Sequence, residues 1–177
     1  MIEFTAWPKI ARGNPLDVVI TEKLDGTNAC IVVDEATGEV GAQSRRRLIT
    51  PTDDNFGFAS WVEANKHNLL LLGGGHHYGE WVGEGIQGNP HEVEGRKFFL
   101  FNTHRWNRDT TPPCCDVVPT LYTGELEKGT ISFLLAMLEE GGSVLGGKAE
   151  GFICYSPLYN RMSKHTILYS GGKWNGR

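Results

Sequence analysis

Short apolar runs that end at turn-forming residues dominate the sequence and constrain its fold most. Two such runs, Asp17–Glu22 and Ala29–Val33, are rich in β-branched residues, and the turn-forming residues Asp25-Gly26-Thr27-Asn28 lie between them. Glycine contributes 23 of the 177 residues, which is typical of a chain with many turns and close backbone approaches. We therefore expect a mainly β protein in which these two runs form a hairpin.

Two longer segments have the apolar spacing of helices. The first is expected over about residues 56–71, with Asp53 or Asp54 capping its start, and the second ends at Gly141-Gly142. Their apolar faces consist of Phe58, Trp61, Val62, Leu69 and Leu72 in the first, and Ile131, Leu134, Leu135 and Leu138 in the second. Further strands are expected near 39–45, 77–82, 97–101, 150–155 and 162–169, with a surface connection over 110–119. Regular strand–helix alternation is missing, so we predict an α+β fold built on antiparallel sheets.

Length and composition exclude several classes of protein. The length fits a single domain, and no apolar stretch approaches the roughly 18 residues of a membrane span. A net charge of −4 argues against a protein that coats nucleic acid without regard to sequence. The four cysteines lack Cys-x-x-Cys spacing, and the N-terminus lacks the features of a secretory signal. We expect a cytoplasmic monomer with reduced thiols and no membrane contact.

Two motifs resemble functional sites, one for a dinucleotide and one for a metal ion, but we interpret both as structural features. Gly83-Glu84-Gly85-Ile86-Gln87-Gly88 matches the dinucleotide-binding pattern, but Asn89-Pro90-His91-Glu92 follows it in place of an amphipathic helix. His76 and His77 are adjacent in a predicted strand, so their side chains point to opposite faces and cannot easily share a metal ion. We interpret the first motif as a glycine-rich turn.

The segment Glu22-Lys23-Leu24-Asp25-Gly26-Thr27-Asn28 is the most informative in the chain. It places a lysine at the end of an apolar strand and beside a tight polar turn, where the amine is held more firmly than an ordinary surface lysine. Lys23 also begins a K-x-D-G pattern. Four later segments supply the other groups that a lysine nucleophile needs: Ser44-Arg45-Arg46, Tyr78-Gly79-Glu80-Trp81, Phe98-Phe99-Leu100-Phe101-Asn102 and Ala149-Glu150-Gly151-Phe152-Ile153.

In this order, these segments resemble motifs I, Ia, III, IIIa and IV of the covalent nucleotidyltransferases, which comprise ATP-dependent DNA and RNA ligases and mRNA capping enzymes. The resemblance covers about residues 20–165. The Glu-Lys-x-x-Gly-Thr-Asn sequence and the Gly-x-Gly-Ile-Gln stretch are most similar to the RNA ligase 2 branch. The resemblance implies a single adenylyltransferase domain over residues 1–177, with the antiparallel, ATP-grasp-like architecture of DNA and RNA ligases.

The same resemblance implies a reaction in three steps. The neutral amine of Lys23 attacks the α-phosphorus of ATP, forms a covalent lysyl-AMP adduct and releases pyrophosphate. The AMP passes to a 5′-phosphate, and a 3′-OH then attacks and releases it. Mg²⁺ or Mn²⁺ is the expected metal, because charge builds on the phosphoryl oxygens. The expected partners are RNA ends or a nicked duplex.

Residue roles follow from the resemblance as well. Glu22 is expected at the adenine edge, and Arg45 at the ribose and phosphate of AMP. Glu80 is expected to bind ribose hydroxyls, and Phe101 to stack on adenine, with Phe99 a core residue on the same strand face. Two further roles complete the set, with Glu150 as the metal ligand and Asn28 in the nucleotide site serving the strand-joining steps.

The C-terminal part departs from the family pattern. Motif V usually carries two lysines spaced K-x-K, whereas Lys164-His165-Thr166 offers one, which we expect to contact the nucleotide phosphates during catalysis. Lys173 is the alternative. From Gly151 to Arg177 the sequence has no acidic residue, and the basic field suits a triphosphate or a nucleic-acid backbone. Full ligases carry an additional C-terminal domain after this point, so end joining is less firmly predicted than self-adenylylation.

Three alternatives remain open from the sequence. One is a small ATP-dependent DNA ligase of the same fold, against which Asn28 and the Ile86-Gln87 stretch favour RNA. Another is a degenerate nucleotide-binding or RNA-binding module without catalysis, which the single motif V lysine favours and the intact Lys23, Glu80 and Glu150 disfavour. GTP-dependent capping is the third.

Overall fold

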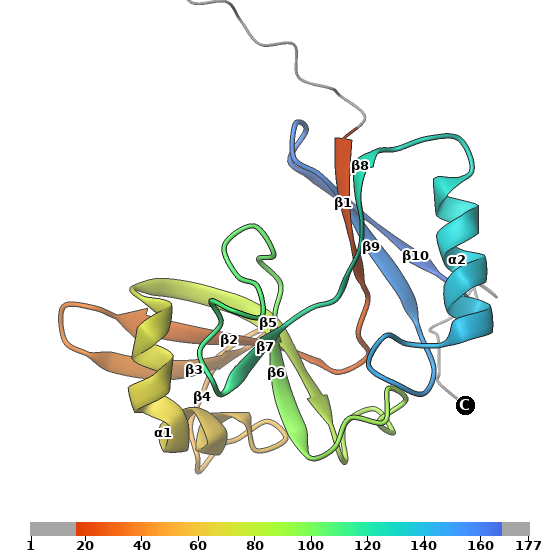
Figure 1. The fold of residues 1–177 in the computed structure, drawn as a ribbon. Helices are drawn as coiled ribbons and strands as arrows, with labels where there is room; N and C mark the ends of the chain where they lie inside the picture. Colours follow the sequence, from red (N-terminus) through yellow and green to blue (C-terminus); the bar gives the residue numbers. More distant parts are fainter. Residues whose placement is uncertain (1–16, 168–177) are drawn as a thin grey trace, which may run out of the picture.

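A computed structural model of the protein describes residues 17–167, which form two β-sheets set at an angle to each other (Figure 1). The smaller sheet has the strand order β10-β9-β1-β8 and the larger has the order β4-β3-β2-β5-β6-β7. The strands of the smaller sheet are β1 (Asp17–Glu22), β8 (Thr120–Glu125), β9 (Gly151–Ser156) and β10 (Arg161–Thr166). Those of the larger sheet are β2 (Thr27–Asp34), β3 (Glu39–Ser44), β4 (Leu48–Ile49), β5 (Gly75–Gly83), β6 (Arg96–Leu100) and β7 (Cys115–Val117).

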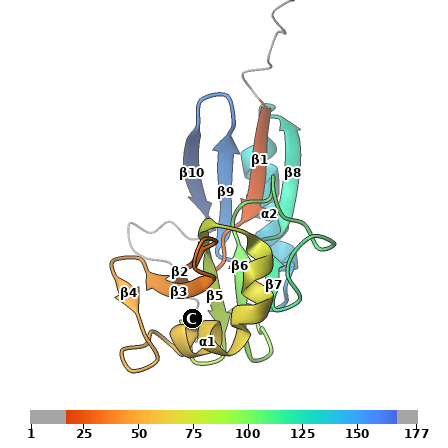
Figure 2. The ribbon, with the colours of Figure 1, turned by 90° about the vertical axis from the view of Figure 1, so that its left-hand side faces the viewer.

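The strand pairing confirms the predicted α+β fold with antiparallel sheets. Within the described chain every strand pair is antiparallel except β6 with β7, which is parallel. Figure 2 shows the strands of the smaller sheet standing side by side above the larger sheet. None of the helices in residues 17–167 is long and apolar enough to cross a membrane.

The predicted hairpin between the first two apolar runs is wrong. β1 pairs with β8 and β9, whereas β2 pairs with β3 and β5 in the other sheet. The two runs do not pair with each other because their apolar side chains belong to different hydrophobic cores. Val18 and Ile20 are buried in the core of the smaller sheet, whereas Ala29 and Ile31 are buried in that of the larger. The turn residues between them therefore form a crossing from one sheet to the other.

Each sheet has its own helix. α1 (Phe58–Leu69), followed by the 3₁₀ turn η1 (Leu70–Leu72), packs on the larger sheet, and α2 (Thr130–Gly141) packs on the smaller one. Both helices were expected from their apolar spacing. The N-cap residue of α1 is Gly57. Asp54 lies before it but still caps the first turn, because its carboxylate accepts hydrogen bonds from the amides of Ala59 (2.7 Å) and Ser60 (3.0 Å).

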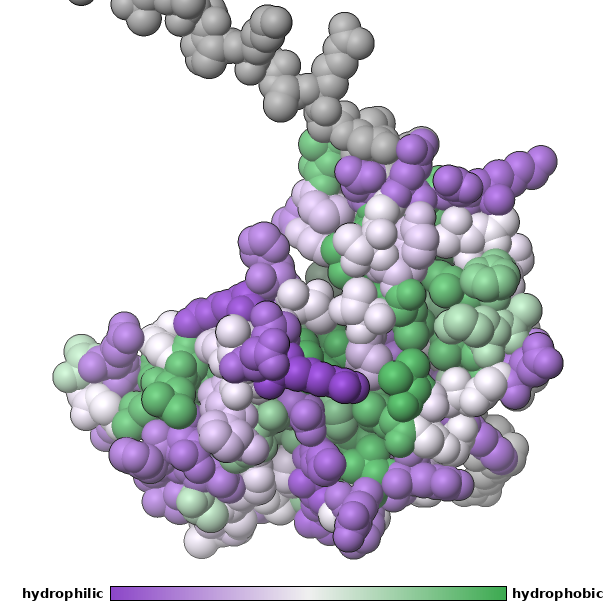
Figure 3. All heavy atoms as spheres, viewed as in Figure 1, coloured by the Kyte–Doolittle hydropathy of each residue, from purple (hydrophilic) through white to green (hydrophobic). Residues whose placement is uncertain are grey.

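A third apolar cluster joins the two sheets. It contains Leu24 from the crossing segment, Val82 from β5, Phe99 from β6, and Val93 and Val118 from two loops. In the view of Figure 3, hydrophilic residues cover most of the face, and hydrophobic residues reach the surface where the sheets meet. Because this cluster fixes the crossing segment against β5 and β6, it also fixes the residues that begin the K-x-D-G pattern.

Candidate active site

Lys23 lies directly after β1, at the point where the chain leaves the smaller sheet. Its backbone amide donates a hydrogen bond to the carbonyl of Gly151 (2.9 Å), and its Nζ forms a hydrogen-bonded ion pair with the carboxylate of Glu150. The Lys23 side chain is 26% exposed and that of Glu150 is 9% exposed. The amine is therefore held on one side by a buried carboxylate and is open to solvent on the other.

Glu80 and Asn28 form the second part of the site. They are opposite each other in the β2–β5 pair, and the Asn28 side-chain amide donates a hydrogen bond of 2.7 Å to the Glu80 carboxylate. Burial raises the pKa of Glu80 to about 7, although the charge of Lys23 and the hydrogen bonds from Asn28 and the Gly26 backbone act to lower it. The charge of Glu150 raises this pKa further, so these groups share one electrostatic environment.

Asp25 is a further acidic group of this environment. Burial and the charge of Glu150 raise its pKa to about 6, whereas the charge of Lys23 lowers it. Sequence reasoning used Asp25 only as part of a pattern, although its position two residues after Lys23 was a sufficient signal for a site residue. Within residues 17–167, no three His, Cys, Asp or Glu side chains lie close enough to hold a metal ion by themselves.

Gly26 is required by close packing. A Cβ atom at this position would collide with the carbonyl oxygen of Trp81 and would lie 2.9 Å from a methyl carbon of Val82. Because the crossing segment runs this closely over β5, a side chain would push Lys23 away from Glu80 and Glu150. The glycine of the K-x-D-G pattern thus has a steric cause in this chain.

Two aromatic rings are exposed near Glu80. The amide of Phe101 donates to the carbonyl of Tyr78 (3.0 Å), which extends the β5–β6 pairing by one position and places both residues on the strand face that carries Glu80. Tyr78 is 57% exposed and Phe101 is 43% exposed, whereas Phe99 is buried as expected. Sequence reasoning missed Tyr78, for which the signal was its two-residue spacing from Glu80.

Glu22 is oriented differently from the expectation. Its side chain is buried on the opposite side of β1 from Lys23, where one carboxylate oxygen accepts a hydrogen bond of 3.0 Å from the Val144 amide. The other oxygen faces the ring of His91. Burial raises the pKa of Glu22, against hydrogen bonds from Ser143 and Val144 that lower it. The Glu22 side chain therefore points into the interior and not toward Lys23.

Arg45 and Lys164 do not contact these groups in the structure. Arg45 is exposed in the loop between β3 and β4, whose third arginine, Arg47, pairs with Asp53. Lys164 is exposed on β10 opposite Ile153, which in turn pairs with Thr21 of β1, so Lys164 and Lys23 share one face of the smaller sheet. Lys173 lies outside the described residues.

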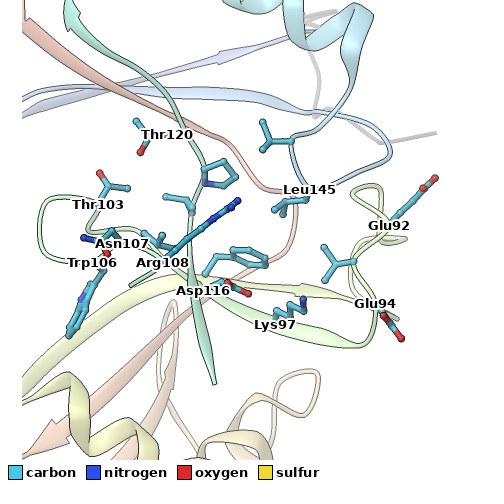
Figure 4. Close-up of a pocket in the computed structure, with 16 residues that line it drawn as sticks. Glu92, Glu94, Lys97, Thr103, Trp106, Asn107, Arg108, Asp116, Thr120 and Leu145 are labelled. Atoms are coloured by element: carbon cyan, nitrogen blue, oxygen red, sulfur yellow. The ribbon is translucent and has the colours of Figure 1, made fainter. Parts of the chain in front are cut away.

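A separate cavity of about 580 Å³ lies where the sheets meet (Figure 4). Its lining includes Lys97, Phe99, Arg108, Asp116 and Leu145. Lys23, Glu80 and Glu150 are not among the lining residues. The cavity is therefore distinct from the site that the motifs predict.

The raised pKa of Glu80 predicts a pH-dependent change in stability for Glu80→Gln. The folded state binds a proton at Glu80 more tightly than the unfolded state does, so the stability cost of this carboxyl appears as pH rises from about 4.5 through about 7. Glu80→Gln should raise the free energy of unfolding by about 3 kcal/mol at pH 8 and by much less at pH 4.5. Denaturant unfolding at both values measures this difference. Glu139→Gln, on an exposed position of α2, is the matched control, and an equal gain for Glu80→Gln at both pH values would contradict the account.

The chain is similar to RNA ligases in sequence and in fold. A sequence model of the RNA ligase family matches residues 16–167. No curated protein matches the chain. Among solved structures, a mutant RNA ligase of Naegleria gruberi with ATP and Mn aligns with a TM-score of 0.63 at 22% identity, covering 86% of this chain and 49% of that one. The Naegleria gruberi RNA ligase with PPi aligns with a TM-score of 0.62 at 23% identity, covering 86% and 50%.

These structural likenesses establish a shared fold, and this chain spans about half the length of the solved structures that it matches. The family match covers most of the sequence and all the segments that supply Lys23, Glu80 and Glu150. The chain belongs to the RNA ligase family.

Proposed function

We propose that the chain is the adenylyltransferase part of an ATP-dependent RNA ligase, with the ATP-grasp-like architecture implied by its motifs, and that Lys23 is its nucleophile. The observation that carries the proposal is the contact between Lys23 Nζ and Glu150, within the same electrostatic environment as Asp25 and Glu80. The solved relatives with ATP or AMP and Mn agree with this proposal.

The proposed first step forms a bond from Lys23 Nζ to the α-phosphorus of ATP and breaks the bond from that phosphorus to the pyrophosphate oxygen. The amine must lose a proton before it attacks. The carboxylate of Glu150 touches Nζ, so it can orient the amine and receive the proton. This contact gives Glu150 a role beyond the metal contact expected from the sequence.

The acidic groups also fit a divalent ion. Mg²⁺ is commonly bound by one or two carboxylates together with substrate phosphates, so a metal that arrives with ATP needs few ligands from the protein. Glu150 would hold it, with Asp25 nearby. When bound, the ion would neutralise phosphate charge and assist pyrophosphate departure.

The remaining groups would bind the nucleotide. We assign ribose hydroxyls to Glu80, which Asn28 holds in place by its hydrogen bond. Phe101, with Tyr78 beside it, would stack on adenine, a contact worth about 1–3 kcal/mol per base. We assign the phosphates to Lys164, which shares a sheet face with Lys23, and to the exposed Arg45.

The first test is covalent transfer of AMP from α-labelled ATP. The chain should retain label through denaturing electrophoresis when Mg²⁺ or Mn²⁺ is present during the reaction. Excess EDTA, added before ATP, should prevent labelling. Lys23→Ala should abolish labelling, because no other amine contacts Glu150 in the described structure. Lys128→Ala, at an exposed lysine outside the site, is the control. Full labelling of Lys23→Ala would refute the proposal.

The second test concerns the nucleic acid. We propose RNA ends as the substrate, with RNA on the 3′-OH side of a nick preferred because the 2′-OH distinguishes RNA from DNA. Sealing of matched RNA and DNA nicks should therefore favour RNA and weaken as salt increases. Better sealing of all-DNA nicks would assign the chain to DNA instead. Self-adenylylation without sealing of either would limit this chain to the first step.

A further inference from the structure

His91 contacts the residues on both sides of Lys23, and no sequence motif predicts this position. It lies in the loop between β5 and β6 and is completely buried. Its Nε2 accepts a hydrogen bond of 2.7 Å from the Asp25 amide, and its Nδ1 lies 3.9 Å from a carboxylate oxygen of Glu22. One imidazole ring therefore faces the chain on both sides of Lys23.

The loop that carries His91 is held in an unusual conformation. Gln87, Asn89 and Glu92 have φ angles of 48°, 49° and 52°, values that residues other than glycine rarely adopt. The Asn89 side chain clamps the loop, since it donates to the Val93 carbonyl (3.0 Å) and accepts from the Val93 amide (3.1 Å). Backbone strain of this kind persists only where surrounding contacts enforce it, and it clusters at functional sites.

The same loop is tied to the segment that leads to Glu150. The Lys148 amide donates a hydrogen bond of 2.7 Å to the carbonyl of Pro90, next to His91. The loop thus contacts the chain just before Glu150 as well as the chain on either side of Lys23.

The contact with Asp25 defines where the imidazole proton sits. Because the Asp25 amide donates to Nε2, a neutral ring must carry its proton on Nδ1, which is directed toward Glu22. Burial lowers the pKa of His91 to about 4, the Lys148 backbone acts in the opposite direction, and the charge of Lys23 lowers it further. The ring is neutral near pH 7 and can accept this hydrogen bond.

We propose that His91 is a positioning residue for Lys23, an inference that rests on the proposed adenylyl transfer. By holding the Asp25 amide, the ring fixes the peptide that follows Lys23 and keeps Nζ directed at Glu150. Without this hydrogen bond, the nucleophile samples other orientations while the groups that bind ATP stay in place. The step affected is the attack of Nζ, and nucleotide binding is affected little.

Two variants at position 91 separate this role from simple packing. His91→Phe keeps a ring of similar size but removes the acceptor, whereas His91→Gln offers an amide oxygen in its place. The single-turnover rate of AMP transfer at saturating ATP should fall about 100-fold in His91→Phe, since a misplacement of about 1 Å can cost this much, with little change in ATP affinity. His91→Gln should recover most of the lost rate. An unchanged rate in His91→Phe, a loss confined to ATP affinity, or no recovery in His91→Gln would overturn the proposal.

A second measurement uses the unmodified chain and does not depend on its activity. Nitrogen-resolved NMR of the histidine rings should show His91 neutral at pH 7, with Nδ1 protonated and Nε2 bare, and exposed His67 provides the comparison. A proton on Nε2 would refute the contact with Asp25 and the positioning role with it. If the unmodified chain transfers no AMP, the proposed function fails, and the NMR result still decides whether His91 holds the Asp25 amide.

Discussion

The ion pair between Lys23 and Glu150 is the interaction on which the site depends. It joins the residue after β1 to the residue before β9, positions that are 127 residues apart in the sequence. An exposed ion pair is worth little, but Glu150 is almost fully buried, and a buried charge is tolerated only with a compensating partner. Because the buried Glu150 carboxylate needs a positively charged partner, the amine of Lys23 stays beside it while remaining partly exposed to solvent.

The two sheets make this pairing possible because the nucleophile lies on the segment that crosses between them. Leu24 anchors the crossing in the apolar cluster at the junction, and Gly26 lets it run closely over β5. Glu80 and Asn28 belong to the larger sheet, whereas Glu150 enters from the smaller one. The site is thus assembled from both sheets, and the ring of His91 accepts a hydrogen bond from the Asp25 amide in the crossing segment.

The sequence predicted the parts of this protein whose signals are local. The helical spacing of Phe58, Trp61 and Val62 depends only on α1, and the motif segments carry Lys23, Glu80 and Glu150 regardless of how the strands pair. The predicted hairpin failed because a turn sequence reports that the chain turns, but not which core the next strand will complete. β4, β7 and β8 were missed. β4 and β7 are short, and β7 also lies between prolines in the stretch expected to be a surface connection, whereas β8 is a half-exposed edge strand.

The groups that escaped prediction are those whose roles depend on distant contacts. The orientation of Glu22 into the interior and the burial of His91 result from packing among β1, the loop after β5 and the segment near Val144. The central claim is that the amine facing Glu150 receives the AMP. Peptide mapping by mass spectrometry, after incubation of the unmodified chain with ATP and Mg²⁺, tests it most directly. The account predicts one acid-labile AMP on the peptide that contains Lys23, and an adduct on any other residue would contradict it.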